Sequence, residues 1–150
     1  MKIFCKKNGF TLIEVLVVIA ILAILFSLVL IAINPGRQFS QANNTKRRSD
    51  VNALLNAIHQ YAADNKGTLP TGITTSVQNI KTGGADICSA IVPTYIAAMP
   101  TDPTTGTTFT NCSTSYDTGY TVVLTASGSG NRITVAAPAA ELSQTVSISR

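Results

Sequence analysis

Histidine, glutamate and cysteine are all scarce in this sequence of 150 residues. It holds one histidine, His59, three cysteines, and two glutamates, Glu14 and Glu141. It has no glycine-rich phosphate loop, and no serine, histidine and aspartate follow in an order that indicates a nucleophile with its base. A metal site would need further cysteine or histidine beside His59. We therefore expect neither an enzyme nor a bound cofactor.

One long hydrophobic run dominates the N-terminal part of the chain. Residues 10–33 form a stretch of 24 in which only Thr11, Glu14 and Ser27 are polar. About 20 apolar residues let a helix cross the roughly 30 Å hydrocarbon core of a bilayer, so this run predicts a transmembrane helix. A glutamate inside it costs about 2.5–3.5 kcal/mol, while each large aliphatic residue returns about 0.3–0.6 kcal/mol. The segment still inserts, and Glu14 needs a partner there, unless it lies at the helix end and reaches interfacial water.

Residues 6–14, KKNGFTLIE, resemble the class III signal of type IV pilins and of the related pseudopilins. That signal is a short basic leader, a glycine, an aromatic residue, and a glutamate four residues later. The resemblance implies that prepilin peptidase removes residues 1–9 by cutting between Gly9 and Phe10, and that Phe10 becomes a methylated N-terminus. It also implies that Phe10, Thr11 and Glu14 act in assembly. Pairing Glu14 with the Phe10 amine of an adjacent subunit would favour one packing register in an apolar environment.

The same resemblance implies the partners. The chain itself is the main one, as a homopolymeric filament, with the assembly platform of a pilus or of a type II secretion system in the inner membrane. Charge alone does not set the orientation, because basic residues lie on both sides of the hydrophobic run. The resemblance places the leader in the cytoplasm and the remainder outside, first as a single-pass anchor and then in a filament or in the cell envelope.

The basic residues give little support for nucleic-acid binding. The formal net charge is +4, but three of the 11 basic residues lie in the leader, which leaves 8 against 7 acidic residues. The cluster of Lys46, Arg47 and Arg48 has no interleaved aromatic residues for base stacking. We expect it to form a solvated helix face or salt bridges between subunits, and DNA binding stays an unsupported alternative.

Residues 34–67 predict an amphipathic helix. Val51, Leu54, Leu55 and Ile58 lie on one stripe with a 3.6-residue period. A proline and a glycine at 35–36 predict a kink or local melting at its start, or else a plain helix stop. We expect the helix to continue past Ser49 and Asp50, although either residue is able to cap a separate helix, and to end near Gly67.

Residues 68–150 predict a head in which a long connection precedes antiparallel strands. We expect a helical turn within residues 85–95, dense turn chemistry at 100–106, and a hairpin of residues 119–126 and 132–136. Leu142, Val146 and Ile148 alternate and predict a last strand or a flexible end. With the hairpin packed on the helical stripe, the fold class is α+β, with a long N-terminal helix on a small sheet, as in pilins.

Two cysteines remain once the leader is removed, because Cys5 leaves with it. Cys88 and Cys112 would face an oxidising compartment, so we expect a disulfide worth roughly 3 kcal/mol, against the alternatives of free thiols or a metal site.

Asp102 or Asp117 is a candidate for Ca²⁺, as in some pseudopilins, but no alternating series of acidic or amide ligands accompanies them. We therefore expect no metal.

Three functions stay open. The first is a structural subunit of a type IV pilus-like filament, and the second is a pseudopilin of a type II secretion system. The loop at Asp102 favours the pseudopilin, as would a calcium requirement of the head, whereas the disulfide-bounded segment favours the pilin. The third is a minor pilin that binds DNA.

Overall fold

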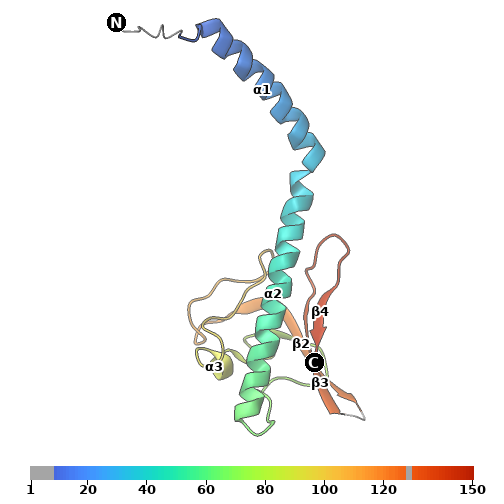
Figure 1. Cartoon of the computed structure of the whole chain (residues 1–150). Coiled ribbons are helices and arrows are strands. Elements are labelled where there is room, and N and C mark those ends of the chain that lie inside the picture. Colours follow the sequence, from blue (N-terminus) through green and yellow to red (C-terminus); the bar gives the residue numbers. More distant parts are fainter. Residues whose placement is uncertain (1–8, 128–129) are drawn as a thin grey trace, which may run out of the picture. The chain divides into compact units, whose positions relative to one another are not determined.

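The computed structural model describes residues 9–127 and 130–150 (Figure 1). The chain divides into two units, Met1–Gln38 and Phe39–Arg150. Of the leader predicted for residues 1–9, only Gly9 lies within the described residues. Two long helices precede a four-stranded antiparallel sheet, so the α+β class expected from the sequence is confirmed.

Helix α1 (Leu12–Ile33) contains the hydrophobic run. None of its 22 residues is buried. In the described part of the chain it is the one helix that is long and apolar enough to cross a membrane. An apolar surface of this size has to be covered by lipid or by other protein chains.

A single residue separates α1 from the next helix. Asn34 is left-handed, with φ 50° and ψ 81°, and α2 (Pro35–Asp64) starts directly after it. Proline disfavours helical geometry in the preceding residue but suits the first position of a helix, which explains both the stop and the restart. Asn34 also caps α2, because its Oδ1 accepts a hydrogen bond from the Arg37 N–H at 3.3 Å. The predicted interruption is therefore one residue long and precedes the proline.

Helix α2 continues without a break past Ser49 and Asp50, as the sequence predicts. It ends where the Gly67 N–H donates a hydrogen bond to the Ala62 carbonyl at 2.7 Å. Lys66 and Gly67 both have positive φ, 55° and 85°, as is typical of a left-handed helix cap. The predicted helix end is confirmed.

The sheet has the strand order β1-β2-β3-β4. Its centre is the predicted hairpin, formed by β2 (Asp117–Ser127) and β3 (Gly130–Ala137). Val122 lies opposite Val135, and Leu124 lies opposite Ile133. On β3 the alternation of Ile133, Val135 and Ala137 places buried side chains on one face.

Of the two edge strands, β1 was not predicted, whereas the expected last strand is confirmed for Val146 and Ile148 but not for Leu142. Strand β1 (Gln78–Lys81) lies in the long connection, and only Ile80 of its four residues is buried, so the apolar signal is too weak to predict it. Strand β4 (Val146–Ser149) begins after Leu142, which is exposed and has a φ of 59°. Including Leu142 in the last strand was wrong, because residues 138–145 form a loop tied to α2.

The core lies between α2, the sheet and a short helix, α3 (Cys88–Ile91), which is the helical turn expected within residues 85–95. The stripe on α2 is fully buried against the sheet side chains Tyr120, Val122 and Val135. Figure 1 shows α2 lying along the sheet, with α3 beside it. The predicted packing of the hairpin on the α2 stripe is confirmed.

Candidate functional site

The N-terminal end of α1 forms a capping box. The Glu14 N–H donates to Thr11 Oγ1 at 3.3 Å, and the Thr11 N–H donates to Glu14 Oε2 at 3.5 Å. This arrangement satisfies two backbone donors that a helix end leaves free, and it places a carboxylate where the helix dipole favours negative charge. The Glu14 side chain therefore turns back toward the residues that precede the helix.

Gly9 and Phe10 lie before this cap. Phe10 is 82% exposed, and a side chain added at Gly9 would meet nothing within 4 Å. The peptide bond between them is thus accessible to a protease. Once cut, it would leave an amine on Phe10 one residue before the cap, near an acid that lacks a cationic partner among the described residues. The arrangement is suited to an ion pair, within the chain or between copies of it.

The basic cluster on α2 differs from the expectation. Arg47 is fully buried, and its Nε donates to Asp102 Oδ2 at 2.6 Å. Lys46 Nζ donates to the Thr101 carbonyl at 3.1 Å, and Arg48 Nη2 donates to Gln144 Oε1 at 3.0 Å. The prediction of a solvated face or of salt bridges between subunits was wrong for Arg47, because its partners come from loops of the same chain.

Asp102 is saturated by protein donors. Besides Arg47, its Oδ1 accepts from the Thr104 N–H and hydroxyl, both at 2.8 Å, and from the Thr105 N–H at 3.0 Å. Burial alone would raise the pKa of Asp102, but the hydrogen bonds from Arg47, Thr104 and Thr105 together lower it well below its usual value. The carboxylate is therefore held in its charged form.

The comparisons with known proteins agree with the N-terminal geometry. The prokaryotic N-terminal methylation motif matches residues 5–33. The chain is 38% identical to type II secretion system core protein G of Aeromonas hydrophila over 100 residues, which are 65% of this chain and 68% of that protein. It is 34% identical to the Vibrio cholerae protein of the same name over 113 residues, 69% of each chain. The Escherichia coli protein of that name is 42% identical over 60 residues, 40% of each chain. No solved structure matches significantly.

The chain belongs to the type IV pilin and pseudopilin family. The predicted family is thereby confirmed, and the chain is a structural subunit of the pilin or pseudopilin kind. This is a family of structural subunits, not of enzymes. The exposed apolar helix α1 and the methylation motif fit a membrane-anchored protein of the cell envelope.

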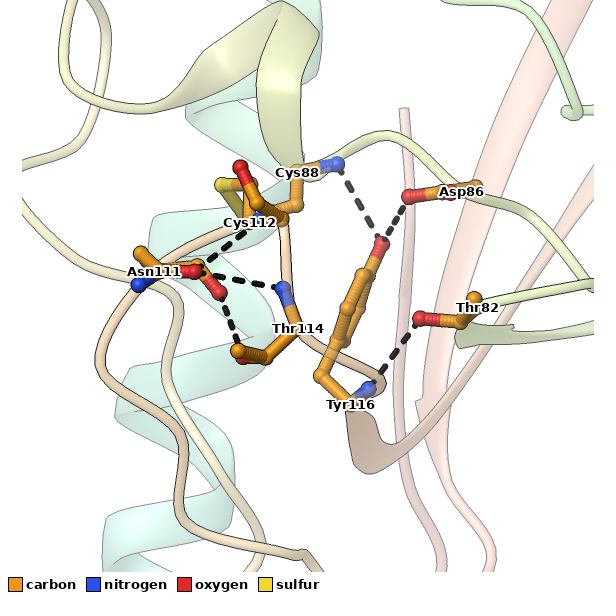
Figure 2. The surroundings of a disulfide bond; sticks show 8 residues. Thr82, Asp86, Cys88, Asn111, Cys112, Thr114 and Tyr116 are labelled. Carbon is orange, nitrogen blue, oxygen red and sulfur yellow. Dashed lines mark hydrogen bonds between the residues drawn. A yellow bond between two sulfur atoms is a disulfide. The ribbon is translucent and has the colours of Figure 1, made fainter.

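In this pilin-like head the two cysteines are joined. A disulfide connects Cys88 on α3 to Cys112, with 5.5 Å between the two Cα atoms (Figure 2). Beside it, the Tyr116 hydroxyl donates to Asp86 Oδ1 at 2.8 Å and accepts from the Cys88 N–H at 3.3 Å. Burial and then the hydrogen bond to Asp86 raise the pKa of Tyr116. The phenol thus holds the start of α3 against the chain that leads into β2.

Asp102 and Asp117, the two candidates for Ca²⁺, do not belong to a cluster of three or more acidic, histidine or cysteine side chains in the described part of the chain. Among residues 9–127 and 130–150, no three histidine, cysteine or acidic side chains lie close enough to hold a metal. Asp102 has its oxygens occupied by Arg47 and two threonines, and Asp117 Oδ1 accepts from the Gly119 N–H at 2.9 Å. Ca²⁺ prefers six to eight oxygen ligands. We derive no role for calcium in this head.

Sequence reasoning missed the cluster of Arg47, Asp102 and Glu141. Arg47 was grouped with its basic neighbours, and Asp102 was weighed only as a calcium ligand. Glu141 carried the one usable signal, since it is one of two glutamates and lies among small and apolar residues. Its Oε2 accepts from Arg47 Nη1 at 2.9 Å.

Proposed function

We propose that this protein polymerises through its N-terminal helix into a type IV pilus-like filament after prepilin peptidase removes residues 1–9. The observation that carries the proposal is the exposed peptide bond between Gly9 and Phe10, followed at once by a capped and fully exposed apolar helix. Such a helix is stable as a membrane anchor before assembly and as the buried centre of a bundle afterwards.

Glu14 is the residue that selects the register in this proposal. In the single chain its carboxylate bonds the Thr11 N–H at 3.5 Å, which is a long and weak contact. A neighbouring subunit offers a stronger partner, the cationic amine of its Phe10. An unpaired carboxylate in an apolar bundle is costly, so packing registers that leave Glu14 without this amine are disfavoured.

Of the two destinations of such a filament, the pseudopilus of a type II secretion system is better supported. Three relatives carry the name type II secretion system core protein G. On this proposal the leader lies in the cytoplasm, α1 spans the inner membrane, and the assembly platform there adds subunits to a filament that stays in the envelope.

An extracellular pilus is the second candidate. The specific observation in its favour is the disulfide between Cys88 and Cys112, which bounds a segment of the head. DNA binding by a minor pilin loses support, because the buried Arg47 is unavailable to phosphate.

The experiment is N-terminal sequencing and intact-mass measurement of the protein in sheared surface fibres and in the envelope fraction. We expect a chain that begins at methylated Phe10 and is recovered with the envelope. Processed chains in the sheared fibres would instead support the extracellular pilus. A chain that keeps residues 1–9 in cells with an active prepilin peptidase would refute assembly by this route.

A further inference from the structure

Arg47 makes contact with two carboxylates that come from separate loops. Its Nε and Nη2 reach the two oxygens of Asp102 at 2.6 and 3.2 Å, and its Nη1 reaches Glu141 Oε2 at 2.9 Å. Asp102 lies in the turn of residues 100–106, and Glu141 lies in the loop of residues 138–145, which precedes β4. The side chains of Arg47 and Asp102 are both fully buried, whereas that of Glu141 is 32% exposed.

The loop of residues 138–145 is held to α2 mainly through side chains. Asn44 donates from Nδ2 to the Glu141 carbonyl at 2.8 Å and accepts from the Glu141 N–H at 2.9 Å. The Glu141 carboxylate also accepts from Asn43 at 3.0 Å and from Ser40 at 3.1 Å. Hydrogen bonds from Arg47 and Asn43 lower the pKa of Glu141, so its charge is retained at neutral pH.

All four carboxylate oxygens of Asp102 and Glu141 accept hydrogen bonds from donors of this chain. A buried acid that lies close to a second, partly exposed acid from another loop needs a cation between them. A guanidinium is suited to this task, because it is planar, always charged, and donates in several fixed directions. Arg47 also donates to Asn44 Oδ1 at 2.9 Å and to Thr104 Oγ1 at 2.7 Å, so each of its three nitrogens has a partner.

We propose that Arg47 is the built-in cation of this head, which cross-links Asp102 and Glu141 and so fixes both loops to α2 without a metal ion. A bound divalent ion would act in the same way on two loops, but it would depend on the free ion concentration. The guanidinium of Arg47 is part of the chain, so it is present at any ion concentration. The head therefore keeps its two loops ordered in surroundings that contain no calcium, whatever filament it enters.

The test uses the full chain in detergent micelles and measures hydrogen–deuterium exchange and thermal unfolding, with and without excess EDTA and with added Ca²⁺. For the unaltered chain we expect the melting temperature and the exchange of both loops to be the same in all three conditions. In Arg47→Gln, exchange should rise at least about tenfold in residues 100–106 and in residues 138–145, because two charges lose their partner. The matched control is Arg132→Gln, which removes an exposed arginine on β3.

A second variant keeps the test decisive if Arg47→Gln fails to fold. Glu141→Gln alters a partly exposed side chain and removes one of the two charges that Arg47 bridges. Its exchange should rise in residues 138–145, while residues 100–106 stay protected. The proposal is overturned if EDTA lowers the melting temperature or speeds exchange of either loop in the unaltered chain. It is also overturned if both loops of a folded Arg47→Gln variant stay protected, or if Glu141→Gln leaves residues 138–145 as protected as before.

Discussion

Reduction of the disulfide between Cys88 and Cys112 should destabilise the head without opening its folded state at once. The bond joins cysteines 24 residues apart. When it is cleaved, the segment that leads to β2 keeps other contacts. The Phe109 and Tyr116 rings lie 4.8 Å apart, and the Thr107 N–H still donates to the Asp117 carbonyl at 2.7 Å. The main effect therefore falls on the unfolded chain, which gains conformational freedom.

The magnitude follows from the length of the closed loop. A crosslink that closes about 25 residues removes chain entropy equivalent to about 3.5 kcal/mol at room temperature. In a domain of about 100 residues, each kcal/mol shifts the melting temperature by about 4 °C or more. Reduction should therefore lower the melting temperature of the head by roughly 14 °C or more.

The assay is the near-ultraviolet circular dichroism of tyrosine during heating, before and after reduction with dithiothreitol. All four tyrosines lie in the unit Phe39–Arg150, three in the head and Tyr61 on α2, and the protein has no tryptophan, so the tyrosine signal does not report on α1. Cys112→Ala is the control, because it should melt near the reduced protein and should not respond to dithiothreitol. A reduced protein that melts within about 2 °C of the oxidised one would refute the reasoning.

Three further predictions concern the head and the N-terminus. Because the pKa of Asp102 is lower in the folded than in the unfolded chain, its contribution to stability is complete above about pH 4 and declines as the pH falls below that value. The free energy of unfolding of Asp102→Asn should therefore depend less steeply on pH in this acid range. Gly119→Ala should lower the free energy of unfolding by about 3 kcal/mol or more, because φ is 75° and the added Cβ would lie 2.7 Å from the Asp102 Cβ. The matched variant Gly83→Ala should lower it by only about 1 kcal/mol, because φ is 80° there but the added Cβ meets open space. Thermal unfolding measures both. Glu14→Ala should leave cleavage before Phe10 intact and lower the filament yield, and a normal yield would contradict the pairing of Glu14 with that amine.

Local patterns in the sequence predicted much of this molecule. The hydrophobic run, the helical stripe from Val51 to Ile58 and the alternation of Ile133 and Val135 each repeat with the period of one secondary structure, so neighbouring residues are enough to recognise them. The processing signal of residues 6–14 is also local. The methylation motif that matches residues 5–33 covers it, and the family follows from it.

Two elements of the head, β1 and the loop that contains Leu142, could not be predicted from local sequence patterns. Strand β1 has a single buried residue, Ile80, and exists because β2 offers it backbone partners 36 to 44 residues away in sequence. Leu142 has the spacing of a strand residue, yet the hydrogen bonds of Glu141 to α2 keep it in a loop. Edge strands and loops take their conformation from whichever element they meet.

The sequence alone determined that this chain has a long apolar helix, carries the N-terminal methylation motif, and places a hairpin on an amphipathic helix. Only the tertiary structure decided what Arg47 does. Its partners lie 55 and 94 residues along the chain, and within its own segment it is one of three similar basic residues. Local sequence determines which segments form helices and strands. An ion pair depends instead on which distant loops reach the same buried point once the core has formed.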